Sequence, residues 1–92
     1  MNTAAAGRRR EHKSRRWLED RGFHVVRAAA SKGLFDLVAI GATCVELVQV
    51  KTNRPPSPAE RRAMLALAVP VNVRKRIHVW RTRAREPRIV EL

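Results

Sequence analysis

Apolar and polar positions divide the first half of the chain into four expected elements. Residues 8–21 are rich in helix formers and end before Gly22, a residue typical of the position after a helix C-terminus. Residues 23–30, 34–40 and 44–52 are richer in apolar and β-branched side chains, which predicts three strands. The second and third of these strands are separated only by residues 41–43, so we expect them to form an antiparallel hairpin.

The second half begins with a proline-rich stretch that cannot continue a strand. Ser57, Pro58 and Glu60 then form the S-x-x-E pattern of a capping box with proline at the first helical position, and Pro70 prevents the helix from continuing. Residues 76–82 predict a last strand, and residues 83–92 a charged tail that contains one apolar pair. The order α-β-β-β-α-β favours an α/β fold, in which a small mixed sheet is flanked by helices.

The size of the chain limits it to one domain, which we expect to cover residues 1–92 with residues 1–7 as a flexible arm. Its 20 Lys and Arg against 8 Asp and Glu give a net charge of +12, which favours a nucleic acid as partner. One cysteine, no zinc-ligand cluster, no signal peptide and no apolar run long enough to span a bilayer lead us to expect a cytoplasmic protein.

Three polar residues interrupt the apolar strands: Asp36, Gln49 and Lys51. Gln49 and Lys51 are two residues apart, so they point to the same side of their strand, and the hairpin could bring Asp36 beside them. Glu11 shares one side of the first helix with Leu18, at the edge of the core, and could reach the same place. Carboxylate, amide and backbone carbonyl oxygens are ligands that Mg²⁺ or Mn²⁺ prefers.

A purely structural interpretation of these residues is also open. Asp36 and Lys51 could form an ion pair, with Gln49 on the surface of an edge strand. Glu11 could serve only as the helical partner of Arg15.

The tryptophan and cysteine residues and two of the histidines are expected to have structural roles. His24 and His78 have no paired ligand spacing, so we expect them to be packed or exposed. Trp17 and Trp80 are expected in the core, and Cys44 as a small buried hydrophobe.

Several short motifs occur together in this sequence: Gly7-x3-Glu11, Gly22-Phe23, Val26-Arg27, Ser31-x-Gly33, Asp36-Leu37-Val38 and Val48-Gln49-Val50-Lys51-Thr52. Together these motifs resemble those of the PD-(D/E)XK nuclease superfamily. Within the superfamily the chain is similar to the archaeal-type Holliday junction resolvases, which phages also encode. The resemblance covers residues 7–82 and includes the order of elements.

The resemblance implies a site for divalent metal, expected to be Mg²⁺ with Mn²⁺ as a substitute. Its ligands would be Glu11, Asp36 and Gln49, with Val50 as a further ligand through its backbone. Lys51 would be the catalytic lysine.

The resemblance also implies that Ser31 and Arg27 contact the region of the scissile phosphate. The sequence departs from the family pattern at Phe35, where proline is usual, and at His12, where arginine is usual. The largest departure is Gln49, which replaces an acid.

These features predict a metal-dependent endonuclease that resolves four-way DNA junctions by paired symmetric nicks. The alternatives are a related nuclease acting on other branched or single-stranded DNA, and a basic binding module without catalysis. Two nicks favour a homodimer, for which residues 63–69 and 79–80 offer apolar surface. The expected DNA contacts are basic side chains at Arg8, Arg9, Arg10, His12, Arg15, Arg27 and Lys32.

Overall fold

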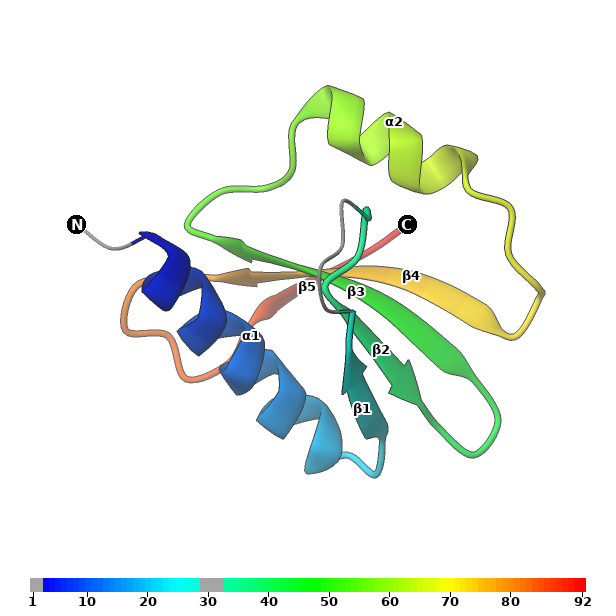
Figure 1. Cartoon of the computed structure of the whole chain (residues 1–92), viewed down its shortest axis with the longest axis horizontal. Helices are drawn as coiled ribbons and strands as arrows, with labels where there is room; N and C mark the ends of the chain where they lie inside the picture. Colours follow the sequence, from blue (N-terminus) through cyan, green and yellow to red (C-terminus); the bar gives the residue numbers. More distant parts are fainter. Residues whose placement is uncertain (1–2, 29–32) are drawn as a thin grey trace.

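A computed structural model describes residues 3–28 and 33–92, with the side chains of residues 7–28 and 33–92. Two helices and five strands follow one another along the chain (Figure 1). They are α1 (Thr3–Glu19), β1 (His24–Arg27), β2 (Leu37–Ile40), β3 (Val45–Thr52), α2 (Pro58–Ala66), β4 (Val73–Trp80) and β5 (Arg88–Glu91).

The five strands form one mixed sheet in the order β1-β2-β3-β4-β5. The predicted hairpin is confirmed, because β2 and β3 are antiparallel with Leu37 opposite Val48 and Ile40 opposite Val45. β3 and β4 are parallel, and α2 lies in the connection between them, as a parallel pair requires a crossover. Because β3 and β4 are parallel, their C-terminal residues Thr52 and Trp80 lie at the same end of the sheet.

The structure differs from the expected elements at both ends of the chain. α1 begins at Thr3, although residues 1–7 were expected to be a flexible arm. The expected charged tail contains β5, which pairs with β4 and places Val90 opposite Ile77. The apolar pair Ile89-Val90 is too short to predict a strand from the sequence. The hydrogen bonds with the neighbouring β4 define β5 as a strand.

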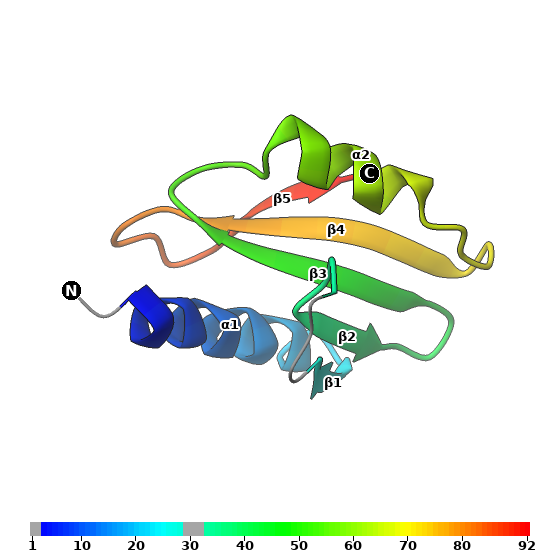
Figure 2. The ribbon, with the colours of Figure 1, turned by 45° about the horizontal axis from the view of Figure 1, so that its top comes forward.

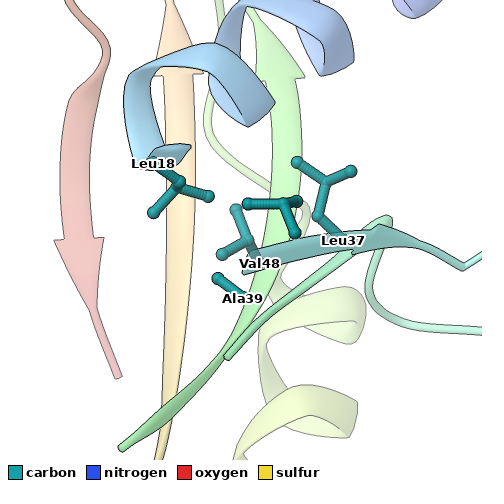
Figure 3. Close-up of a cluster of buried hydrophobic side chains, with 5 residues drawn as sticks. Leu18, Leu37, Ala39 and Val48 are labelled. Atoms are coloured by element: carbon teal, nitrogen blue, oxygen red, sulfur yellow. The ribbon is translucent and has the colours of Figure 1, made fainter. Parts of the chain in front are cut away.

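The helices cover opposite faces of the sheet (Figure 2). On the α1 face, Leu18 packs with alternate residues of the strands, as Figure 3 shows for Leu37, Ala39 and Val48, and all four are at most 1% exposed. On the α2 face a second cluster contains Phe35, Met64, Ile77 and Val79. None of the described helices is long and apolar enough to cross a membrane.

The capping box of α2 is confirmed. The Ser57 hydroxyl accepts a hydrogen bond from Glu60 N at 3.2 Å, and Ser57 N donates to Glu60 Oε1 at 3.0 Å. At the other end of α2, Lys75 Nζ donates to the carbonyls of Leu65 and Leu67. Both ends of this short helix are therefore fixed by side chains.

A polar network is buried where α1 meets β4. Ser14 Oγ accepts a hydrogen bond from Trp80 Nε1 at 2.7 Å and lies 3.0 Å from His78 Nδ1. The His78 ring also packs edge-to-face on Trp17 at 5.3 Å. Burial, with the neighbouring charges of Arg76 and Arg21, lowers the pKa of His78 to about 4. The His78 imidazole is therefore neutral at pH 7, and it packs as a buried part of the core.

The histidine, tryptophan and cysteine side chains for which packing roles were expected differ in their burial. His24 is exposed and His78 is fully buried, Trp80 is in the core, and Cys44 is half-buried. The expectation that residues 79–80 offer a dimer surface is wrong, because both side chains are at most 3% exposed.

Candidate active site

Asp36 immediately precedes β2 and is fastened to β3 through both its backbone and its side chain. Asp36 N donates to Val48 O at 2.8 Å, and Asp36 Oδ2 accepts a hydrogen bond from Val50 N at 2.8 Å. The register of the hairpin, which the sequence left open, thus brings the Asp36 carboxylate to the C-terminal end of β3, beside the Gln49-Val50-Lys51 segment.

Gln49 and Lys51 lie on the same side of β3, as their spacing predicted, and both contact α2. Lys51 Nζ forms a salt bridge with Glu60 Oε2 at 2.8 Å. Gln49 Nε2 donates to the same oxygen at 3.3 Å and to Leu34 O at 3.2 Å. Lys51 therefore pairs with Glu60, and an Asp36–Lys51 ion pair is not found among the described residues.

The sequence pattern places Glu60 only in the capping box. The structure shows that its carboxylate has two roles, because Oε1 caps α2 while Oε2 holds Lys51 and Gln49. The hydrogen bonds from Lys51 and Ser57 lower the pKa of Glu60 to about 2. The available signal was that the N-terminus of α2 follows β3 after only five residues, which keeps Glu60 near the end of that strand.

Glu11 reaches the other side of this site from α1. Glu11 Oε1 accepts a hydrogen bond from Arg27 Nε at 3.1 Å. The interpretation of Glu11 as the partner of Arg15 is wrong, since Arg15 pairs with Glu19 at 3.2 Å. Arg27, expected near the scissile phosphate, is half-exposed at the C-terminal end of β1.

The Asp36 carboxyl group is affected by burial and by the charges of nearby side chains. Burial is the main reason that the pKa of Asp36 is raised, and the like charge of Glu11 raises it further. The hydrogen bond from Val50 N and the positive charges of Lys51 and Arg27 oppose this shift. A cation bound beside a carboxylate in this environment would stabilise its ionised form.

Three side chains with oxygen atoms are candidate ligands for a divalent cation. Gln49 is 7% exposed, and its Oε1 is buried without a hydrogen-bond partner in the described residues, because Nε2 makes the contacts to Leu34 and Glu60. In the described part of the chain no group of three or more His, Cys, Asp or Glu side chains could hold a metal. The available ligands are instead mixed: the carboxylates of Asp36 and Glu11, and the amide oxygen of Gln49. Such oxygen atoms are typical ligands of Mg²⁺ or Mn²⁺.

The expected DNA contacts are distributed over the exposed sides of α1 and the end of β1. Arg8, His12 and Arg15 line a cavity of about 180 Å³ together with Glu11 and Arg27. Two other predicted contacts differ in position. Arg9 is exposed, whereas Arg10 is half-buried with its Nε shielded from solvent. Ser31 and Lys32 lie outside the described residues.

The mixed five-stranded sheet, the flanking helices and the Asp36…Gln49-Val50-Lys51 arrangement define a nuclease-like fold of the PD-(D/E)XK class. Residues 2–57, more than half of the chain, match the family model described as archaeal Holliday junction resolvase (Hjc), so the chain belongs to this family. Members of the family are nucleases that use divalent metal.

The similarity extends to a solved structure. The 1.6 Å structure of Hjc from Archaeoglobus fulgidus, a Holliday junction resolvase from an archaeal hyperthermophile, has the same fold with a TM-score of 0.74. It is 22% identical in sequence, and the match covers 94% of this chain and 72% of that one. None of the curated proteins matches this sequence.

Proposed function

We propose that this protein is a metal-dependent endonuclease that resolves four-way DNA junctions by paired symmetric nicks. The observation that carries the proposal is the Asp36 carboxylate bonded to Val50 N, directly between Gln49 and Lys51 in a chain of the resolvase family. A basic binding protein without catalysis has no need of a half-buried carboxylate whose pKa is raised by burial and by the like charge of Glu11.

Asp36, Gln49 and Glu11 would hold Mg²⁺, with the Val50 carbonyl as a further ligand and Mn²⁺ able to substitute. When bound, the metal would neutralise charge on the scissile phosphate and make water a better nucleophile. Glu11 now pairs with Arg27, so turning Glu11 toward the metal would release Arg27 to bind the phosphate. The same two side chains then exchange an internal ion pair for contacts with metal and substrate.

Lys51 would stabilise the negative charge that develops on the phosphate during attack. Glu60 holds the ammonium group 2.8 Å away in a partly exposed salt bridge, which fixes its position at the end of β3. Glu60 also places a carboxylate against Gln49, the position where the family has an acid. The site therefore keeps a nearby negative charge, supplied by α2 instead of β3.

Phosphate contacts by Arg8, Arg9, Arg10, His12 and Arg15 on α1, and by Arg27, would bind the junction without reading bases. From the resemblance, Ser31 would contact the region of the scissile phosphate, and Lys32 would be a further DNA contact. A homodimer would supply the second active site. The half-exposed Leu65 and Leu67 at the end of α2 offer apolar surface for it, and light scattering should give twice the monomer mass.

The proposal is tested by incubating the protein with a four-way junction and with a linear duplex of the same sequence, with and without Mg²⁺. We expect paired nicks in the junction only when metal is present. Lys51→Ala should reduce the rate at least about a hundredfold with junction affinity within a few-fold, because Lys51 acts on the transition state. Arg62→Ala, an exposed charge removed from α2, is the control.

Two results would contradict the proposal. Tight junction binding with no metal-dependent nicking of any DNA would favour the non-catalytic binding module. Efficient cleavage of single-stranded or other branched DNA, with little cleavage of four-way junctions, would favour the related nuclease activity.

A further inference from the structure

A second basic groove lies on the side of α1 away from Glu11 and Arg27. Its volume is about 490 Å³, and it is lined by residues of α1 and of the loop that joins β4 to β5. Figure 1 shows where α1 and this loop lie in the fold. Its charged lining consists of Lys13, Arg16, Arg83 and Arg85, with Asp20 as the single carboxylate. None of the four basic side chains forms a salt bridge with a residue that the structure describes.

This charge arrangement differs from that of the candidate active site. There, Arg27 is paired with Glu11 and Lys51 with Glu60. In the second groove the positive charges are left without such partners and gather around one concavity. Concentrated positive charge of this kind attracts a polyanion.

The loop that provides Arg83 and Arg85 is held firmly by Asn53. Asn53 Oδ1 accepts a hydrogen bond from Thr82 N at 2.9 Å, and Asn53 Nδ2 donates to Thr82 Oγ1 at 3.0 Å. Asn53 N also donates to Trp80 O at 2.8 Å, and Arg81 Nη1 donates to Asn53 O at 2.9 Å. One residue, two positions after Lys51, thus ties the loop to the end of β3.

The backbone in this region adopts conformations that side chains disfavour. Asn53 has φ of 60° and Arg83 has φ of 66°, and these are the non-glycine residues with positive φ in the described chain. Asparagine tolerates this conformation, whereas for arginine it is uncommon. Thr82, which Asn53 holds, directly precedes Arg83, and Arg83 lines the groove. Strained residues of this kind cluster at functional sites.

The groove and the candidate active site lie at the same end of the sheet. Thr52 and Trp80 are opposite each other at the ends of β3 and β4, so the loop after Trp80 begins beside the strand that carries Lys51. A basic concavity over the exposed side of α1, lined by Arg8, Arg9, His12, Lys13 and Arg16, connects the two flanks of the helix. The positive surface is therefore continuous from Arg27 around α1 to Arg85.

We infer that this groove binds the phosphate backbone of a second duplex arm of a branched DNA, while the arm to be cut lies on the Glu11 side of α1. The inference rests on the proposed function for its choice of branched DNA. A linear duplex in the active site would need only one flank of α1, so the groove would add affinity specifically for DNA with arms that diverge. Preference for junctions would then come in part from the position of Arg83 and Arg85.

The test measures binding by fluorescence anisotropy in EDTA, where cleavage does not occur. The probes are a four-way junction and a linear duplex of equal total length. Arg83→Gln with Arg85→Gln should weaken junction binding about tenfold and reduce the salt slope by about 1.8, from two lost phosphate contacts. Duplex affinity should change less than about twofold to threefold. The matched control is Arg62→Gln with Arg74→Gln, which removes two exposed charges outside the groove and should affect both probes equally and weakly.

A second variant separates position from charge. Asn53→Ala removes the contacts to Thr82 without changing net charge, and it should lower junction affinity several-fold with little effect on the duplex. Its melting temperature is measured in parallel, and Arg85→Gln alone provides a variant with an unaltered loop. Excess inorganic phosphate at constant ionic strength should not abolish junction binding, because a single phosphate cannot replace the multiple contacts of a duplex arm.

Three outcomes would overturn the inference: no effect of the groove variants, an equal loss for duplex and junction, or an equal loss in the control pair. All three are measured without metal. Failure of cleavage would therefore count against the proposed function and leave the groove result standing, and the reverse also holds.

Discussion

Two sets of polar side chains are buried in this small protein, and they differ in the charge that they carry. Beneath α1, Ser14 links His78 and Trp80 in a network that is at most 2% exposed and carries no charge at pH 7. At the end of β3, Asp36 is a half-buried carboxylate near another acid, and the Gln49 amide oxygen has no hydrogen-bond partner in the described part of the chain.

The comparison shows that buried polarity alone does not identify an active site. The Ser14 network stabilises the contact between a helix and a strand. His78 Nε2 is also buried without a hydrogen-bond partner among the described residues, but no group of this network is charged at pH 7. The Asp36 cluster instead contains a carboxylate whose ionised form is disfavoured by burial, and the Gln49 amide oxygen as a candidate ligand. It is also accessible to solvent, since the side chains of Lys51 and Glu60 are 27% and 39% exposed. A carboxylate with a raised pKa, at a place that substrate can reach, is a stronger indication of catalysis than buried polarity alone.

The largest expected effect that separates the two clusters comes from Asp36→Asn. Cleavage should fall at least about a hundredfold, because a metal ligand and its charge are lost. The metal-free protein should be as stable as the wild type or slightly more stable at pH 7. The raised pKa of Asp36 means that folding favours its protonated form, so its ionised form reduces stability as pH rises.

Cleavage is measured on the junction, stability by thermal unfolding in EDTA, and metal binding by calorimetry. Nicking by Asp36→Asn at the wild-type rate would show that Asp36 is not a metal ligand. A strong loss of stability would place Asp36 with the structural cluster.

His78 should make the protein sensitive to acid. Its folded pKa of about 4 lies below its ordinary value of 6.5, so the unfolded state binds the proton more readily. Stability is therefore fully present above pH 6.5 and is lost as the pH falls toward 4, by about 3 kcal/mol. Urea denaturation between pH 7 and 4 measures the loss, and NMR titration of the His78 ring identifies its source. A His78 ring that titrates near pH 6.5 in the folded protein would contradict this assignment.

The sequence predicted the local parts of this molecule well. Ser57, Pro58 and Glu60 lie within four residues, so their pattern determined the start of α2. Alternation along β3 correctly placed Gln49 and Lys51 on one side, and the short turn correctly paired the strand with β2.

Contacts between distant segments could not be predicted in the same way. The Asn53–Thr82 contact joins residues far apart in the sequence, and β5 exists because β4 offers a free edge. The contact of Glu60 with Lys51 depends on how the connection between β3 and α2 folds back. Such contacts follow from tertiary geometry, which hydrophobic periodicity does not contain.

A smaller effect is expected from Ser14→Ala in the structural cluster. The substitution leaves the Trp80 indole N–H without its buried acceptor, which should reduce stability by about 1–3 kcal/mol. Trp80→Phe in the same chain removes the orphaned donor, so the double variant should lose less than the sum of the single losses. Urea denaturation measures the three variants. Cleavage by folded Ser14→Ala at low temperature should match the wild type, and a selective loss of cleavage would mean that this network takes part in the reaction.

The smallest expected effect concerns Gln49, the acid position of the family. Gln49→Glu should tighten Mg²⁺ binding a few-fold, because a charged oxygen replaces a neutral one. Without metal, the new carboxylate would face Glu60 Oε2, which now accepts a hydrogen bond from Gln49 Nε2 at 3.3 Å, and stability should fall by about 1 kcal/mol.

Adding Glu60→Gln tests whether these two positions share one charge. Glutamine can still complete the capping box, so this substitution removes the carboxylate and retains the start of α2. The double variant should regain the metal-free stability while keeping the tighter metal binding, as measured by calorimetry and thermal unfolding in EDTA. Strictly additive effects would show that Glu60 and position 49 act independently, and weaker metal binding by Gln49→Glu would show that Gln49 is not a ligand.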